Sequence, residues 1–103
     1  MSISKQFFIN LEKFAKEHKF DAGHGFDHFM TVYNHAICAI RSEDEELDKK
    51  TETMILLTAL THDVDDAKFF GDAKLTNYRN ARELLKTESL TSTEIETIIY
   101  MIS

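Results

Sequence analysis

The stretch LLTALTHDVDDAKFF, residues 56–70, places one histidine and three aspartates directly after a run of apolar side chains. The run MILLTAL, residues 54–60, is apolar on all sides, which predicts a helix that is buried from several directions. A carboxylate next to a buried segment is costly unless a cation, a partner or water compensates it. We therefore expect this segment either to reach the surface abruptly or to hold a ligand.

The spacing within this stretch leaves two interpretations open. His62, Asp65 and Asp66 stand at positions i, i+3 and i+4 and would share one face of a helix, whereas the neighbours His62 and Asp63 would diverge by about 100°. Spacing alone therefore favours Asp66 as the partner of His62. Alternatively, the aspartates form a solvated helix end, although negative charge is unfavourable at the C-terminal end of a helix. A bound cation would remove that penalty.

The N-terminal part of the chain also shows helical periodicity. Apolar residues recur at helical spacing in residues 4–18 and again in residues 27–41, so we expect a helix in each range. Between them, the glycines of KFDAGHGF, residues 19–26, predict a turn. This turn carries His24 and immediately precedes His28.

The C-terminal part predicts two further helices. Residues 77–86 form a shorter periodic segment, and Thr91 with Glu94 fits a capping box that opens a fifth helix. The apolar face of this last helix consists of Ile95, Ile98, Ile99 and Ile102. Proline is absent, and we find no alternating strand pattern and no repeat. We therefore predict one all-α domain over residues 1–103, a bundle of about five helices.

Composition limits the classes of partner. The chain has 103 residues, 43% of them hydrophobic and 29% charged, which is typical of one soluble globular domain. Its net charge of −6 opposes attraction to nucleic-acid polymers and anionic membranes. No long apolar span or basic, apolar leader is present, so we expect no membrane partner and a cytoplasmic location. Cys38 is the single cysteine and is expected to be a small buried core residue.

Two motifs together resemble the HD-domain superfamily of metal-dependent phosphohydrolases: HGFDHFMTVYNHA, residues 24–36, and LLTALTHDVDDAKFF, residues 56–70. The resemblance implies that His28, His62 and Asp63 bind one divalent metal ion together with a distant aspartate. The resemblance thus pairs His62 with Asp63, whereas helical spacing pairs His62 with Asp66. It also places the distant aspartate on a helix beyond the last residue of this chain, so we expect an incomplete HD-type domain.

The resemblance implies further roles around the metal. Asp66 would handle the attacking water, Lys68 would contact a phosphate, and His24 would border the substrate pocket. The chain differs from the usual first motif at Thr31, where the family often has arginine. The metal could be manganese, iron, cobalt, zinc, nickel or magnesium, because mixed imidazole and carboxylate ligands suit several ions.

These features predict a metal-dependent phosphohydrolase that acts on a nucleotide or another small phosphorylated compound. One alternative is a degenerate or truncated HD domain that serves as a non-enzymatic binding or dimerisation module. A second alternative is an iron oxygenase, because two histidines and one carboxylate also form the ligand set of ferrous oxygenases. We further expect a homodimer through the C-terminal apolar face, whose packing partners would lie on helices that this chain lacks.

Overall fold

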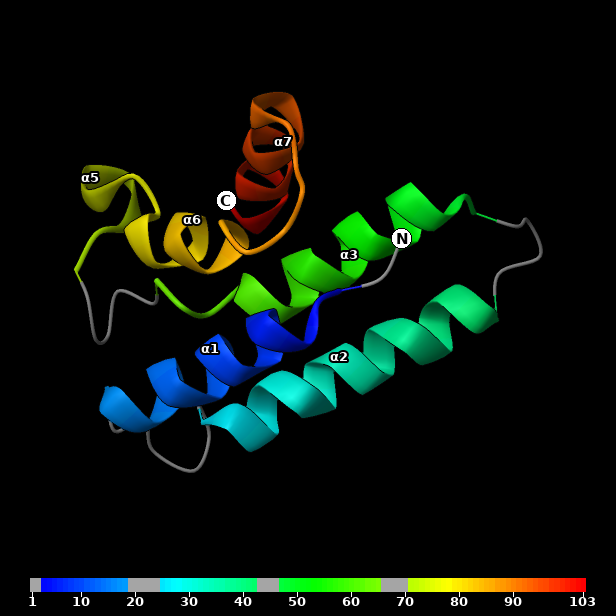
Figure 1. Cartoon of the computed structure of the whole chain (residues 1–103), viewed down its shortest axis with the longest axis horizontal. Coiled ribbons are helices and arrows are strands. Elements are labelled where there is room, and N and C mark those ends of the chain that lie inside the picture. Colours follow the sequence, from blue (N-terminus) through cyan, green and yellow to red (C-terminus); the bar gives the residue numbers. More distant parts are fainter. Residues whose placement is uncertain (1–2, 19–24, 43–46, 66–70) are drawn as a thin grey trace.

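The computed structural model describes residues 3–18, 25–42, 47–65 and 71–103, and the regular structure in these ranges is entirely helical (Figure 1). The all-α prediction is confirmed. No helix in this part of the chain has the length and apolar character needed to cross a membrane. The helices of the described ranges are α1 (Lys5–Glu17), α2 (Phe26–Arg41), α3 (Lys49–Thr61), α5 (Ala73–Thr76), α6 (Arg79–Leu85) and α7 (Ser92–Ile102).

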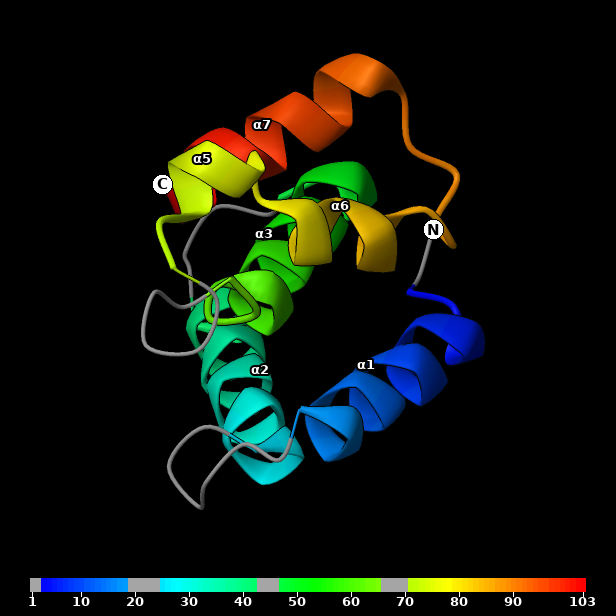
Figure 2. The ribbon, with the colours of Figure 1, turned by 90° about the vertical axis from the view of Figure 1, so that its left-hand side faces the viewer.

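Helix α3 lies at the centre of the packing. It contacts α2 on one side and α6 and α7 on the other, as Figures 1 and 2 both show. Leu57 and Leu60 of α3 are fully buried on one face of the helix, whereas the other residues of the run 54–60 are half-buried. The three neighbouring helices thus cover α3 from more than one side, but only one of its faces is fully buried. The buried apolar core comprises Phe7, Leu11, Ala15, Phe29, Leu57, Leu60, Val64, Ala81, Leu84, Leu85, Ile98 and Ile99.

Helices α3 and α7 each begin at a side-chain cap, and an ion pair connects their first turns. The Asp48 carboxylate accepts a hydrogen bond from the Thr51 amide at 2.7 Å, which caps α3. Thr91 and Glu94 form the predicted capping box at the start of α7. The Lys50 ammonium lies 2.9 Å from the Glu94 carboxylate. The first turns of the two helices are therefore held together by an ion pair.

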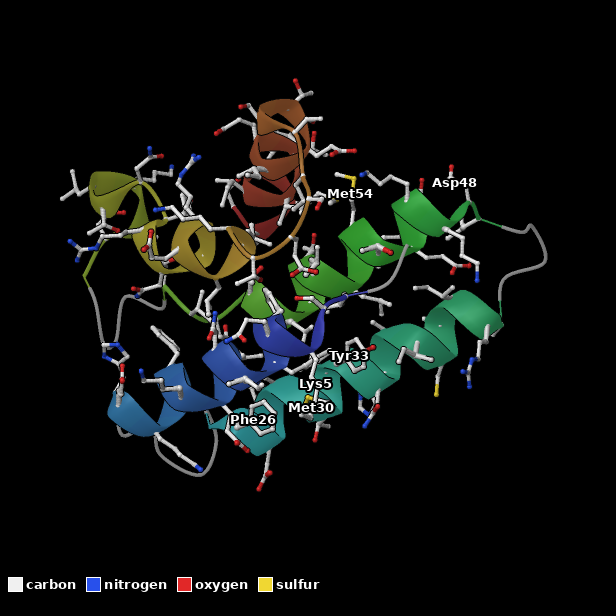
Figure 3. The ribbon with its side chains drawn as sticks, viewed as in Figure 1. Lys5, Phe26, Met30, Tyr33, Asp48 and Met54 are labelled. Atoms are coloured by element: carbon white, nitrogen blue, oxygen red, sulfur yellow. The ribbon has the colours of Figure 1, made fainter. Side chains whose placement is uncertain are left out.

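Helix α2, which carries His28, docks mainly through its N-terminal half. Phe29 is its only fully buried residue, and Phe26, Met30 and Tyr33 pack partly buried against the core (Figure 3). Cys38 is exposed, so the prediction that it is a core residue is wrong. Cys38 stands away from the apolar stripe of α2, and the C-terminal half of α2 has no fully buried position.

The helix expected over residues 77–86 is α6, which begins at Arg79 and not at Asn77; the short helix α5 precedes it. Asn77 (φ 56°) and Tyr78 (φ 53°) are both left-handed, and such residues interrupt a right-handed helix. They end α5 and precede α6. The Arg82 side chain holds this corner: its Nε donates to the Asn77 carbonyl at 2.7 Å, and its guanidinium also pairs with Glu96 of α7.

The C-terminal apolar face is covered by the chain itself. Ile98 is fully buried and Ile99 is 6% exposed, because α7 packs against α3 and α6. Ile95 and Ile102 pack partly buried against the same core. The expectation that this face is bare without further helices is therefore wrong. Dimerisation of the chain stays a prediction, without support from this face.

Glu88 connects the turn before α7 to the start of α1. Its carboxylate accepts hydrogen bonds from the Ser4 amide at 2.9 Å, the Ser4 hydroxyl at 2.6 Å and the Thr87 hydroxyl at 2.7 Å. Burial by itself would raise the pKa of Glu88, but the bonds from Ser4 and Thr87 outweigh it, and the pKa is lowered. The ionised carboxylate thus stabilises the attachment of α1.

We predict that Glu88→Gln lowers the free energy of unfolding by about 1 kcal/mol at neutral pH, since hydrogen bonds to a partly screened charge are lost. The folded-state pKa lies below the unfolded value, so this stabilisation exists above the unfolded pKa and disappears as the pH falls through the folded pKa. Urea unfolding at several pH values should therefore show the difference between wild type and variant narrowing in acid. Glu83→Gln, at an exposed carboxylate of α6, is the control. If wild type and Glu88→Gln differ in free energy of unfolding by the same amount at all pH values, the stabilising role of the Glu88 charge is contradicted.

Candidate metal centre

The antiparallel pair α2 and α3 brings two distant motifs together. Helix α2 runs away from the site and α3 runs back toward it, so the first turn of α2 lies beside the last turn of α3 (Figure 1). His28 belongs to that first turn, and His62 is the C-terminal cap of α3. Asp63 follows directly. The three residues that the sequence analysis selected as metal ligands therefore converge on one end of the helix pair.

The distances among these three side chains match a metal site. The Nε2 atoms of His28 and His62 each lie 3.2 Å from the same oxygen, Oδ2 of Asp63. Two ligand atoms bound about 2.1 Å from one ion at angles of about 90° to 110° would lie about 3.0 to 3.4 Å apart. One ligand atom from each residue falls within 4.8 Å of the other two.

The tautomer of His62 follows from its second nitrogen. Nδ1 of His62 lies 2.6 Å from the carbonyl oxygen of Ala59. Because a carbonyl oxygen only accepts, Nδ1 must carry the hydrogen. In the neutral ring, Nε2 then presents a lone pair to a carboxylate oxygen of Asp63. A proton on Nε2 or a metal ion between the two atoms makes this contact attractive, and a backbone acceptor behind the ring is typical of metal-binding histidines.

The site is open to solvent. The side chains of His28, His62 and Asp63 are 32%, 35% and 25% exposed. An ion and a small ligand can therefore reach all three without a rearrangement of the core. Among the described residues, these three form the group that could hold a metal ion.

The local backbone explains why adjacent residues can share a site. Helix α3 ends at Thr61, and residues 62–65 form a turn. The divergence expected for neighbours on a helix therefore does not apply to His62 and Asp63. Asp66, which spacing favoured as the partner of His62, lies outside the described residues, as do Lys68 and His24.

Asp65 has a function that the sequence analysis missed. The residue is only 7% exposed, and its carboxylate accepts hydrogen bonds from the amides of Asn80 and Ala81, both at 3.0 Å. Asp65 therefore caps α6 instead of sharing a helix face with His62. No local signal could reveal this, because the donors lie at least 15 residues away in the sequence.

Two other histidines lie apart from this group. The ring of His18, at the end of α1, contacts Phe14 with 4.5 Å between ring centroids. His35 is exposed on α2. Neither belongs to the group formed by His28, His62 and Asp63.

Comparison with known proteins adds one relative. Uncharacterized protein L803 of Acanthamoeba polyphaga mimivirus is 38% identical over 79 residues, which are 77% of this chain and 30% of that protein. The chain thus spans less than a third of the length of this curated relative. No family model and no solved structure matches the chain.

We predict that the protein binds one Mn²⁺ or Co²⁺ ion and that His28→Ala or His62→Ala weakens binding by on the order of tenfold or more, because each substitution removes a ligand atom. Isothermal titration of the metal-free protein measures this directly. His35→Ala removes an exposed histidine from the same helix as His28 and should leave the affinity unchanged. Equal affinities for all four proteins would place the ion elsewhere.

Proposed function

We propose that this chain is part of a metal-dependent phosphohydrolase of the HD type that acts on a nucleotide or another small phosphorylated compound. The observation that carries the proposal is the convergence of His28, His62 and Asp63, from two separate motifs, at ligand distances. The resemblance of these motifs to the HD superfamily supplies the reaction class. The fold is consistent with it, because the regular structure of the described residues is entirely helical.

The three ligands would perform distinct tasks at the centre. Asp63 offers the negative charge, and both imidazoles offer neutral nitrogen donors. The Ala59 carbonyl orients the ring of His62. When bound, a divalent ion lowers the pKa of water from about 15.7 to about 7 and neutralises charge on phosphoryl oxygens. Three protein ligands leave coordination positions for water and substrate.

Small substrates fit the surroundings better than polymers. All three ligands are partly exposed, so the site admits a small anion from solvent. The net charge of −6 disfavours long nucleic acids, whose binding depends on neutralising many phosphates. Within this proposal, Asp66 would accept the proton of the attacking water, Lys68 would contact a phosphoryl oxygen and His24 would border the substrate.

We predict that hydrolysis of nucleoside monophosphates or of p-nitrophenyl phosphate by the full chain requires Mn²⁺ or a similar ion. Chelator and His62→Ala should both abolish it. Asp66→Asn should retain metal but lose about 10²- to 10⁴-fold in turnover, because it removes a proton acceptor without removing a ligand. Phosphate release and metal titration, measured on the same variants, separate the two effects. Loss of metal in both variants would contradict the separate roles.

The same assays distinguish the alternatives. Metal binding without any phosphate release across these substrates would favour a binding module. Oxygen consumption with ferrous iron would favour an oxygenase, which can share the ligand set of two histidines and one carboxylate.

A further inference from the structure

Asp65 and Asn80 attach the segment after the proposed metal ligands to α6. The buried Asp65 carboxylate accepts from the amides of Asn80 and Ala81. In return, the Asn80 side-chain amide donates to the Val64 carbonyl at 2.9 Å. These hydrogen bonds join residues 64 and 65 to the first turn of α6. The attachment begins one residue after Asp63.

Helix α6 depends on this attachment for its own N-terminus. Its N-cap residue, Tyr78, has a left-handed backbone (φ 53°) and makes no side-chain capping hydrogen bond. The first amides of a helix lack partners within the helix, and their positive end attracts a negative charge. Asp65 supplies both the acceptor oxygens and the charge. A distant carboxylate thus replaces the missing local cap.

The attachment leaves Asp63 between two fixed points. On one side, His62 is held by the bond from Nδ1 to the Ala59 carbonyl. On the other side, Val64 and Asp65 are held by α6. A functional constellation requires placement of its ligand atoms to within about 0.5 Å. Loss of either fixed point would allow the turn of residues 62–65 to relax and move the Asp63 carboxylate away from the two imidazoles.

We infer that Asp65 and Asn80 are positioning residues for the metal centre, in addition to their part in the stability of α6; this inference rests on the proposed function. The ligand is a divalent cation, and its contacts are made by His28, His62 and Asp63. Asp65 and Asn80 act through the backbone that carries Asp63. Substitutions that replace outer partners of metal ligands typically weaken metal affinity by about 10- to 100-fold.

The test compares Mn²⁺ affinity across variants of the full chain, each confirmed as folded by circular dichroism. Asp65→Ala should weaken binding by about 10- to 100-fold, and Asn80→Ala by a smaller factor, because Asn80→Ala leaves the backbone amides bound to Asp65. Asp48→Ala is the matched control: it removes an aspartate cap from the opposite end of α3 and should leave the affinity unchanged. If Asp65→Ala does not fold, Asn80→Ala decides the outcome.

A second measurement keeps the test independent of metal binding. In the metal-free protein, the imidazole ¹⁵N signals of His28 and His62 report the placement of the Asp63 carboxylate. Asp65→Ala and Asn80→Ala should shift these signals, whereas Asp48→Ala should not. Shifted signals in a protein that binds no Mn²⁺ would support the positioning role and reject the proposed function. Unchanged signals together with unchanged affinity would overturn the positioning role, and Asp65 would then only cap α6.

Discussion

The burial of α3 is the constraint on which the rest of the structure depends. Leu57 and Leu60 are fully buried on one face, and Met54, Ile55 and Leu56 are half-buried around the helix, so α3 needs more than one neighbour to cover it. Helices α2, α6 and α7 provide this cover. Covering α3 with the antiparallel α2 also places the first turn of α2 beside the end of α3. The same packing that removes apolar surface from water therefore assembles the candidate metal centre.

The end of α3 raises an electrostatic problem, since carboxylates there face the negative end of the helix dipole. The structure compensates two of them in different ways. Asp65 turns inward and receives two amides from the positive end of α6. Asp63 stays partly exposed between two imidazoles. One aspartate is thus satisfied within the fold, and the other is available for a cation.

Several connections hold the remaining helices around this centre. Arg82 links the left-handed corner at Asn77 to α7 through Glu96, and Lys50 links the starts of α3 and α7 through Glu94. Glu88 fastens the start of α1. Each is an interaction between residues on different elements. Together they orient α6, whose first turn receives Asp65, with respect to α3.

The sequence by itself determined the helical class, the helix that carries the buried Leu57 and Leu60, the capping box at Thr91 and the choice of His28, His62 and Asp63 as candidate ligands. Periodicity and capping depend on residues a few positions apart, and for that reason they can be read locally. The grouping of these three residues in one site came from a family resemblance, because helical spacing alone favoured Asp66, and not Asp63, as the partner of His62.

Tertiary structure alone decided the features that depend on distant residues or on the exact end of a helix. The burial of Ile98 followed from packing against α3 and α6. The capping of α6 by Asp65 joins residues at least 15 positions apart. The approach of Asp63 to His62 required α3 to end at Thr61. A periodic pattern cannot specify such contacts, because it describes one helix at a time and not the neighbours that cover it.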